Sequence, residues 1–208
     1  MAALSNNLST AERDGERCAA PVLLAGFVIG LGMVDLSVTA LGQTSRFSLQ
    51  LLVLLVFQLI GPVLVSVLAM ALLMPRWLER VAREGPSAWR ASVPAAALVG
   101  LLLMLMFVLS AIVGGILITP RADSLRELSD LLSGIRLRDL LQTLVRSSLF
   151  LGSICAWCQW RSLRALRSGR SEALIVSNLL VEGLIVALAL KLLWVLAFDG
   201  LLRPVASA

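Results

Sequence analysis

The stretches GLLLMLMFVL at residues 100–109 and LLVLLVF at residues 51–57 decide the fold class of this chain. Neither stretch has the polar face that a helix on the surface of a soluble bundle shows with a period of 3.6 residues. Hydrophobic residues make up 59% of the 208 residues, charged residues only 15%, and the mean hydropathy is +0.93. A soluble domain of this length does not need so much apolar surface. The sequence therefore predicts an all-α, polytopic integral membrane protein rather than a soluble helical bundle.

Five stretches have the length and apolar character of membrane-spanning helices. Such a helix needs roughly 20 mainly apolar residues, because the hydrocarbon core of a bilayer is about 30 Å thick. The predicted spans cover residues 21–42, 49–74, 92–119, 144–160 and 173–198. Together they form a single membrane domain over residues 21–198. A polar N-terminal segment (1–20) precedes this domain, and a C-terminal tail (199–208) follows it.

The distribution of arginine predicts the orientation of the chain. The predicted loop 75–91 carries four Arg and two Glu, and the predicted loop 161–172 carries four Arg and one Glu. Cytoplasmic loops are enriched in Arg and Lys, so we expect these loops and the N-terminus in the cytoplasm and the C-terminus outside. On the opposite side, the 120–143 connection balances its charges, and Ser124 and Glu127 form a capping-box pattern. This pattern predicts a short amphipathic helix at the external surface.

The charged residues Asp35, Glu182 and Lys191 lie inside the predicted spans. An unpaired charge at this depth costs at least a few kcal/mol, so each residue serves a substrate path or proton relay, forms a structural pair, or snorkels to the surface. Glu182 and Lys191 are nine residues apart and therefore on opposite faces of one helix, where they cannot pair. Asp35 and Lys191 lie at similar depths in their spans, which makes them a candidate cross-helix pair.

The sequence contains no recognisable constellation for catalysis. It has no His, no Ser in a GxSxG string, no P-loop for ATP and no paired acidic motif for a metal. Cys155 and Cys158 have CxxC spacing but lie in an apolar stretch without a second ligand pair. No aromatic residues alternate with basic ones as they do in sites that stack nucleic-acid bases. We therefore expect no enzymatic activity, no cofactor or metal and no nucleic-acid partner.

Three short strings, in order, resemble the MlaE-type permeases. These strings are Ser45-Arg46-Phe47 after the first span, QLIGPVL at residues 58–64, and LRDLL at residues 137–141. MlaE-type permeases are the membrane subunits of bacterial ABC transporters that move phospholipids or related lipids together with MCE proteins. The resemblance covers roughly residues 20–198. It implies a permease subunit in the bacterial inner membrane, with a cytoplasmic ATPase, an MCE-domain protein, a second permease protomer and membrane lipids as partners.

The resemblance also implies where substrate and partners would bind. A lipid path would run between two protomers, lined by the first, second and fifth spans. Its candidate residues are Gly30, Asp35, Gly61, Pro62, Glu182 and Lys191. The 75–91 segment takes the place of the coupling segment, with Trp77 at the level of the lipid headgroups. Its candidate residues for docking an ATPase or other partner are Arg76, Trp77, Arg80 and Arg83.

Departures from the family pattern leave two functions open. Gln58 and Leu59 replace an Arg-Glu pair, the coupling segment is short and rich in Arg, and Lys191 falls near an acidic position of the family. These differences favour a divergent half of a heterodimeric permease. The alternative is a structural membrane subunit that transports nothing and stabilises a larger complex. Gly26, Gly30 and Gly32 permit close helix packing in the GxxxG manner, although incidental small residues explain the spacing equally well.

Overall fold

The computed structural model describes residues 2–41, 60–118, 137–167 and 172–199, and these residues form helices only. The helices are α1 (Ala2–Leu41), α3 (Gly61–Glu84), α4 (Ala88–Ile118), α6 (Leu137–Arg167) and α7 (Glu172–Trp194), with a 3-10 turn η2 (Gly85–Ser87) and a π-helical turn η3 (Val195–Asp199). For the described residues, the predicted all-α class is confirmed. The string at residues 45–47, the positions of Gln58 and Leu59, the external helix predicted after Ser124 and the end of the C-terminal tail lie outside the described residues.

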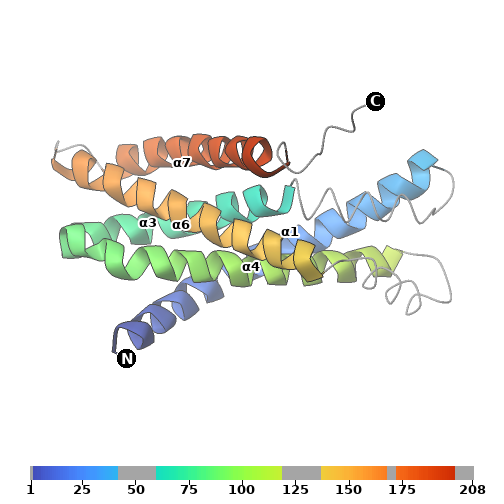
Figure 1. The fold of residues 1–208 in the computed structure, drawn as a ribbon, viewed down its shortest axis with the longest axis horizontal. Coiled ribbons are helices and arrows are strands. Elements are labelled where there is room, and N and C mark those ends of the chain that lie inside the picture. The colour runs from blue at the N-terminus through green and yellow to red at the C-terminus, as the bar shows by residue number, and fades with distance from the viewer. Residues whose placement is uncertain (1, 42–59, 119–136, 168–171, 200–208) are drawn as a thin grey trace.

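The helices run alternately up and down along the long axis of the molecule (Figure 1). Helices α4 and α6 pack on each other, α3 packs on α6, and α7 packs on both α3 and α6. Helix α1 crosses the bundle obliquely and packs mainly on α4. As a result, the first turns of α1, the α3–α4 turn, the end of α6 and the start of α7 all lie toward the same end of the molecule (Figure 1).

Helix α1 begins far earlier than the predicted first span. It runs without interruption from Ala2 to Leu41 and includes Pro21, so the predicted polar segment 1–20 and most of the first predicted span belong to one helix. A proline within a helix removes one backbone hydrogen bond, which packing against neighbouring helices can offset. That packing is visible as one stripe of buried residues spaced three or four apart: Ala11, Asp14, Cys18, Val22, Gly26 and Gly30.

Small residues bring α1 and α4 into backbone contact. A Cβ on Gly26 would lie 2.6 Å from the carbonyl oxygen of Phe107, and a Cβ on Gly30 would collide with the backbone of Ala111. From the other side, Gly114 of α4 lies against the backbone of α1. A Cβ on Gly32 would meet no atom within 4 Å. Close approach through Gly26 and Gly30 is therefore confirmed, and Gly32 takes no part in it.

The predicted loop at residues 75–91 is helical over most of its length. Helix α3 passes through Pro75 and ends at Glu84, a three-residue turn follows, and α4 begins at Ala88. Proline did not stop the helix, because the residues beyond it continue a buried stripe of α3 through Trp77, Leu78 and Val81. The chain reverses at Gly85, whose φ of 60° suits glycine. The two helices form an antiparallel hairpin.

The predicted loop at residues 161–172 is also shorter than expected. Helix α6 continues to Arg167 and α7 begins at Glu172. The segment from Arg161 to Arg167 contains arginine, leucine and alanine, which are good helix formers, so the helix continues past the apolar span. The fifth predicted span, 173–198, agrees with α7 and η3.

Four described segments are long and apolar enough to cross a membrane: Leu8–Gly32, Gly61–Leu117, Leu140–Leu166 and Leu174–Ala197. The second, at 57 residues, contains both α3 and α4 with the turn between them. Large apolar side chains face outward from the bundle, among them Val181, Ile185, Leu188 and Leu192 of α7. Long apolar helices with outward-facing aliphatic side chains are what a multi-pass membrane protein needs, because lipid surrounds its bundle.

Candidate functional site

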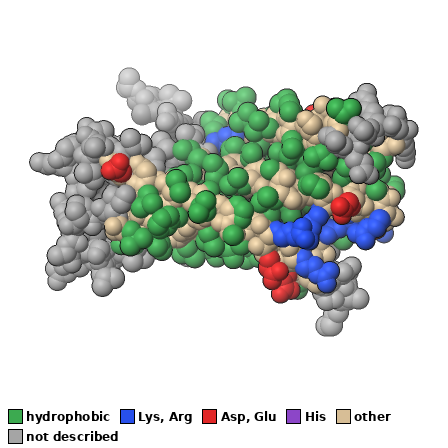
Figure 2. All heavy atoms as spheres, turned by 180° about the vertical axis from the view of Figure 1, so that it is seen from behind, with side chains coloured by type: hydrophobic (Ala, Val, Ile, Leu, Met, Phe, Trp, Pro, Cys, Tyr) green, Lys and Arg blue, Asp and Glu red, His purple; other side chains and the backbone are tan. Residues whose placement is uncertain are grey.

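Charged side chains gather toward one end of the described bundle. Most of the Lys and Arg side chains on the face in Figure 2 lie toward the end that holds the α3–α4 turn, whereas hydrophobic side chains cover most of the rest. Two polar arrangements lie at this end. One joins α1 to α3 and α4, and the other joins α6 to α7.

The first arrangement centres on Asp14, a carboxylate of α1 that is only 3% exposed. Arg76 of α3 donates a hydrogen bond to its Oδ1 at 2.8 Å, and a nitrogen of Arg80 lies 3.9 Å from Oδ2. The two arginines are one helical turn apart, so both reach the same carboxylate from one face of α3. A buried carboxylate between two guanidinium groups fixes the beginning of α1 to α3.

This arrangement continues through α4 into α6. Arg80 donates through Nη1 to Ser92 Oγ at 3.1 Å, and the backbone oxygen of Ser92 accepts a weak hydrogen bond from Cys155 Sγ at 3.7 Å. Gln159, which is fully buried, donates to the same sulfur at 3.4 Å. The result is a polar network that joins α1, α3, α4 and α6 near their charged end. It uses Cys155 as a packed hydrogen-bonding group, and the described residues hold no group of three metal-ligating side chains.

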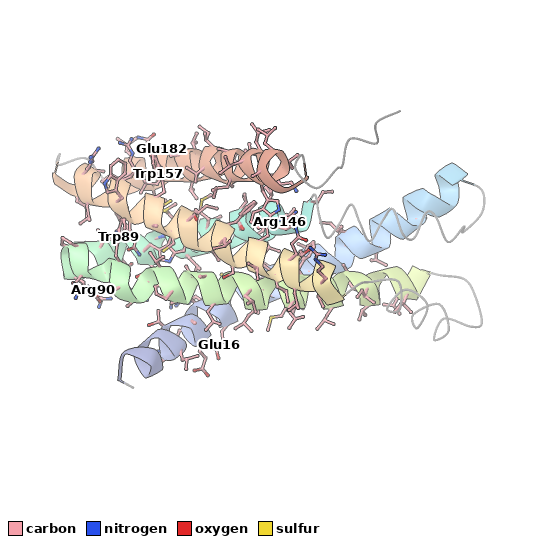
Figure 3. The ribbon with its side chains drawn as sticks, in the orientation of Figure 1. Glu16, Trp89, Arg90, Arg146, Trp157 and Glu182 are labelled. Carbon is pink, nitrogen blue, oxygen red and sulfur yellow. The ribbon has the colours of Figure 1, made fainter. Side chains whose placement is uncertain are left out.

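The second arrangement is a two-point ion pair between Arg161 of α6 and Glu182 of α7. Arg161 donates through Nε to Oε2 at 2.7 Å and through Nη2 to Oε1 at 2.5 Å. Such fork-like pairing of a guanidinium with a carboxylate is strong and directional. The sequence marked Glu182 as a costly charge, but it did not identify Arg161 as its partner. Trp157 of α6 lies beside Glu182 (Figure 3).

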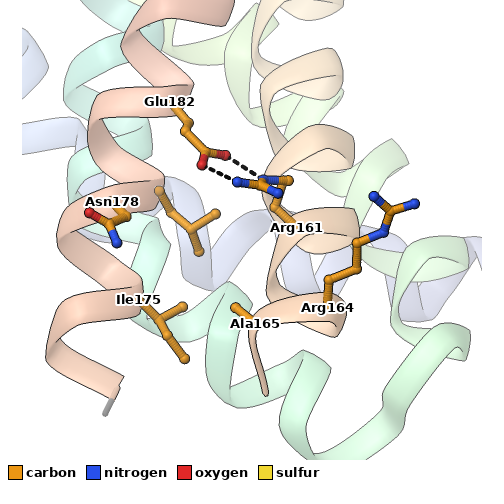
Figure 4. Close-up of a pocket in the computed structure, with 7 residues that line it drawn as sticks. Arg161, Arg164, Ala165, Ile175, Asn178 and Glu182 are labelled. Atoms are coloured by element: carbon orange, nitrogen blue, oxygen red, sulfur yellow. Dashed lines mark hydrogen bonds and ion pairs between the residues drawn. The ribbon is translucent and has the colours of Figure 1, made fainter. Parts of the chain in front are cut away.

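A pocket of about 210 Å³ opens beneath this ion pair, between α6 and α7. Figure 4 shows Ala165 and Ile175 facing each other across the gap, with the Arg161–Glu182 pair above them and Arg164 at one side. The remaining lining residues are Asn178 and Leu179. Arg164 holds its guanidinium 3.9 Å from the centre of the Trp160 ring. The pocket thus combines an apolar floor with an ionic rim.

The predicted path residues do not form one cluster. Gly30 packs on α4, whereas Gly61 and Pro62 are buried where α3 begins. Asp35 lies on the exposed side of α1, and Lys191 is half-buried on α7. Since α1 packs mainly on α4 whereas α7 packs on α3 and α6, the Asp35–Lys191 pair stays a prediction.

The predicted docking residues divide into two groups. Arg76 and Arg80 point inward to Asp14, and Trp77 is 1% exposed within the bundle. The ring of Trp77 fills the interior where α3 packs against its neighbours, and its place at the headgroup level stays a prediction. Arg83 is exposed near the α3–α4 turn. Trp89 and Trp157 are exposed toward this end of the bundle (Figure 3).

A buried charge inside a predicted span escaped the sequence analysis. Arg146 of α6 is 2% exposed and lies 4.8 Å from the centre of the Trp194 ring on α7. Phe150 meets the same tryptophan edge-on, with the ring centres 6.4 Å apart. Arg146 could have been found from the sequence, because it lies inside a predicted apolar span and an arginine there usually makes a buried polar contact. The cation–π contact ties the last turn of α7 to α6.

These features define the class of the protein: the described part of the chain is all-helical, with several helices that can cross a membrane and a charged, internally paired end. Comparison with known proteins gives no match to a family model, to a curated protein or to a solved structure.

Proposed function

We propose that this chain is the membrane permease subunit of an ABC-type transporter for phospholipids or related lipids, and that it is the divergent half of a heterodimer. Helices α1, α3, α4, α6 and α7 would supply five spans. The apolar residues 61–74 of α3 cover only about 21 Å at 1.5 Å per residue. Residues 49–59 would complete that span.

The orientation in this proposal follows from the charged end. Arg13, Arg83, Arg90 and Arg164 are exposed on segments that lie toward one end of the bundle. Cytoplasmic segments of membrane proteins are enriched in Arg, so this end would face the cytoplasm from a bacterial inner membrane. The N-terminus would then be inside and the C-terminus outside.

The observation that carries the proposal is the exposed tip of the α3–α4 hairpin. Arg83, Glu84, Trp89 and Arg90 are exposed there, around the turn at Gly85. A cytoplasmic ATPase could dock on this rigid, charged tip. The chain needs such a partner for powered transport because its sequence has no P-loop. An MCE-domain protein and a second permease protomer would complete the complex.

A second function has its own supporting observation. Arg76, Trp77 and Arg80, which were expected to meet the ATPase, contribute instead to internal packing. This arrangement favours a structural membrane subunit that stabilises a larger assembly without coupling to ATP hydrolysis.

Purification in mild detergent, with a photo-crosslinking residue at Arg83, distinguishes the two functions. The permease proposal predicts that an ATPase and an MCE-domain protein co-purify and that the ATPase crosslinks to position 83. The matched control is the same residue at Arg138, which is exposed near the start of α6 and hence toward the opposite end. If only other membrane subunits co-purify and crosslink, the chain is a structural subunit.

A further inference from the structure

The α6–α7 pocket lies at a level that other residues mark as a membrane surface. Trp89 and Trp157 are 39% and 40% exposed, and Figure 3 places both toward the end that holds Arg90 and Glu182. Tryptophan is enriched where lipid headgroups meet the hydrocarbon core, because its ring is apolar and its N–H is polar. The pocket rim therefore lies where phosphate groups of the lipids are found.

The lining of the pocket carries a net positive charge. Two guanidinium groups, those of Arg161 and Arg164, accompany one carboxylate, that of Glu182. The side chain of Arg161 remains 41% exposed while it is paired, so the ion pair positions its guanidinium without covering it. Arg164 is held over the ring of Trp160. Its side chain therefore loses less conformational entropy when a ligand binds.

The shape of the pocket suits an amphiphile rather than a free ion. Ala165, Ile175 and Leu179 give it an apolar floor, which a phosphate ion alone would leave unused. Asn178 stands at the rim and belongs to the same stripe of α7 as the exposed Leu174, Val181 and Ile185. An acyl chain can follow this apolar stripe toward the middle of the membrane.

We propose that the α6–α7 pocket binds the phosphate headgroup of an anionic phospholipid from the adjacent leaflet. Arg161 and Arg164 hold the phosphate oxygens, and Asn178 donates from its amide to the headgroup. Ala165 and Ile175, which lie nearer the α6–α7 connection than Arg161 does, pack against the polar headgroup, and the acyl chains follow Val181 and Ile185 toward the middle of the bundle. Basic pockets between membrane helices on the cytoplasmic side recognise such lipids through these interactions. The inference rests on the membrane location in the proposed function and is independent of transport.

Native mass spectrometry of the purified full chain in detergent tests this site. The chain is titrated with phosphatidylglycerol, with zwitterionic phosphatidylcholine, and with phosphatidylglycerol in the presence of excess inorganic phosphate. We expect one phosphatidylglycerol per chain, held about tenfold more tightly than phosphatidylcholine, because its net negative charge complements the two arginines whereas phosphatidylcholine is neutral overall. Inorganic phosphate should not displace the lipid.

Three variants connect the binding to the pocket. Arg164→Gln removes one guanidinium and leaves the Arg161–Glu182 pair intact, and Ala165→Phe fills the floor without a change of charge. Each should weaken phosphatidylglycerol binding about tenfold, by the loss of one charged contact or of the cavity. Arg90→Gln, the control, removes an exposed arginine outside the pocket and should leave binding unchanged. Size-exclusion elution and the melting temperature verify that each variant is folded.

Several outcomes would overturn the assignment. Equal affinity for the two lipids would remove the role of charge, and an equal loss in Arg90→Gln would indicate general surface attraction. Displacement by inorganic phosphate would make the ligand a free anion. Unchanged binding in folded Arg164→Gln would exclude the pocket even if Ala165→Phe did not fold. Since no ATPase or partner is present, failure here is distinguishable from failure of the transporter proposal.

Discussion

Arg161 and Glu182 join α6 to α7 through two hydrogen bonds, at 2.7 and 2.5 Å, with Arg161 in the last two turns of α6 and Glu182 in the third turn of α7. The Arg80–Ser92 hydrogen bond joins α3 to α4 and is centred on η2. Both hairpins are therefore fastened by polar contacts near their turns.

Breaking the Arg161–Glu182 pair should loosen α7 from α6. The side chains are 41% and 29% exposed, so Glu182→Ala is expected to lower the melting temperature only modestly, as for a well-oriented pair near a surface. The exchanged pair Arg161→Glu with Glu182→Arg should recover much of this loss. Thermal unfolding in detergent measures both, and a melting temperature unchanged in Glu182→Ala would show that the pair contributes nothing.

Removing the Asp14 carboxylate should be more damaging. Asp14→Asn leaves Arg76 and Arg80 without their counter-charge in a mostly buried setting, and breaking a buried pair in this way costs about 3–5 kcal/mol. The side chains of Arg76 and Arg80 are 27% and 18% exposed, so we expect a loss at the lower end of that range.

Glu16→Gln is the matched control for Asp14, because Glu16 lies on the same helix but is exposed. It should unfold like the unmodified chain. Equal melting temperatures for Asp14→Asn and Glu16→Gln would mean that the buried network does not anchor α1.

The α1–α4 contact predicts opposite results for two nearby glycines. Gly30→Ala places a Cβ against the backbone of Ala111 and should destabilise the chain by about 1–3 kcal/mol through overpacking. Gly32→Ala meets open space and should be neutral, or stabilise by up to about 1 kcal/mol through helix propensity. Thermal unfolding of the two variants side by side is the measurement, and the same effect at both positions would argue against this packing.

The apolar cores of the helices could be predicted from sequence because lipid imposes both their length and their composition. Their ends could not. Pro75 is an ordinary stop signal, but burial of Trp77 and Val81 on the next turns keeps α3 helical to Glu84. Tertiary packing can override a local helix-stop signal such as a proline, and that packing is known only from the folded bundle.

The site was predicted in part. Glu182 was recognised because a carboxylate in an apolar stretch is costly, whereas Arg161 was missed because it was assigned to a loop. Asp14 was missed because residues 1–20 were treated as a polar segment outside the membrane domain.

The central claim is a multi-pass chain whose arginine-rich end faces the cytoplasm, and an accessibility measurement in whole cells tests it most directly. Cysteine is placed singly at Arg83, near the α3–α4 turn, or at Arg138, near the start of α6, after replacement of the native Cys18, Cys155 and Cys158. A membrane-impermeant maleimide added from outside should label position 138 and reach position 83 only after the cells are opened. Labelling of position 83 in intact cells, with position 138 protected, would contradict the orientation, the ATPase docking site and the lipid site in the cytoplasmic leaflet together.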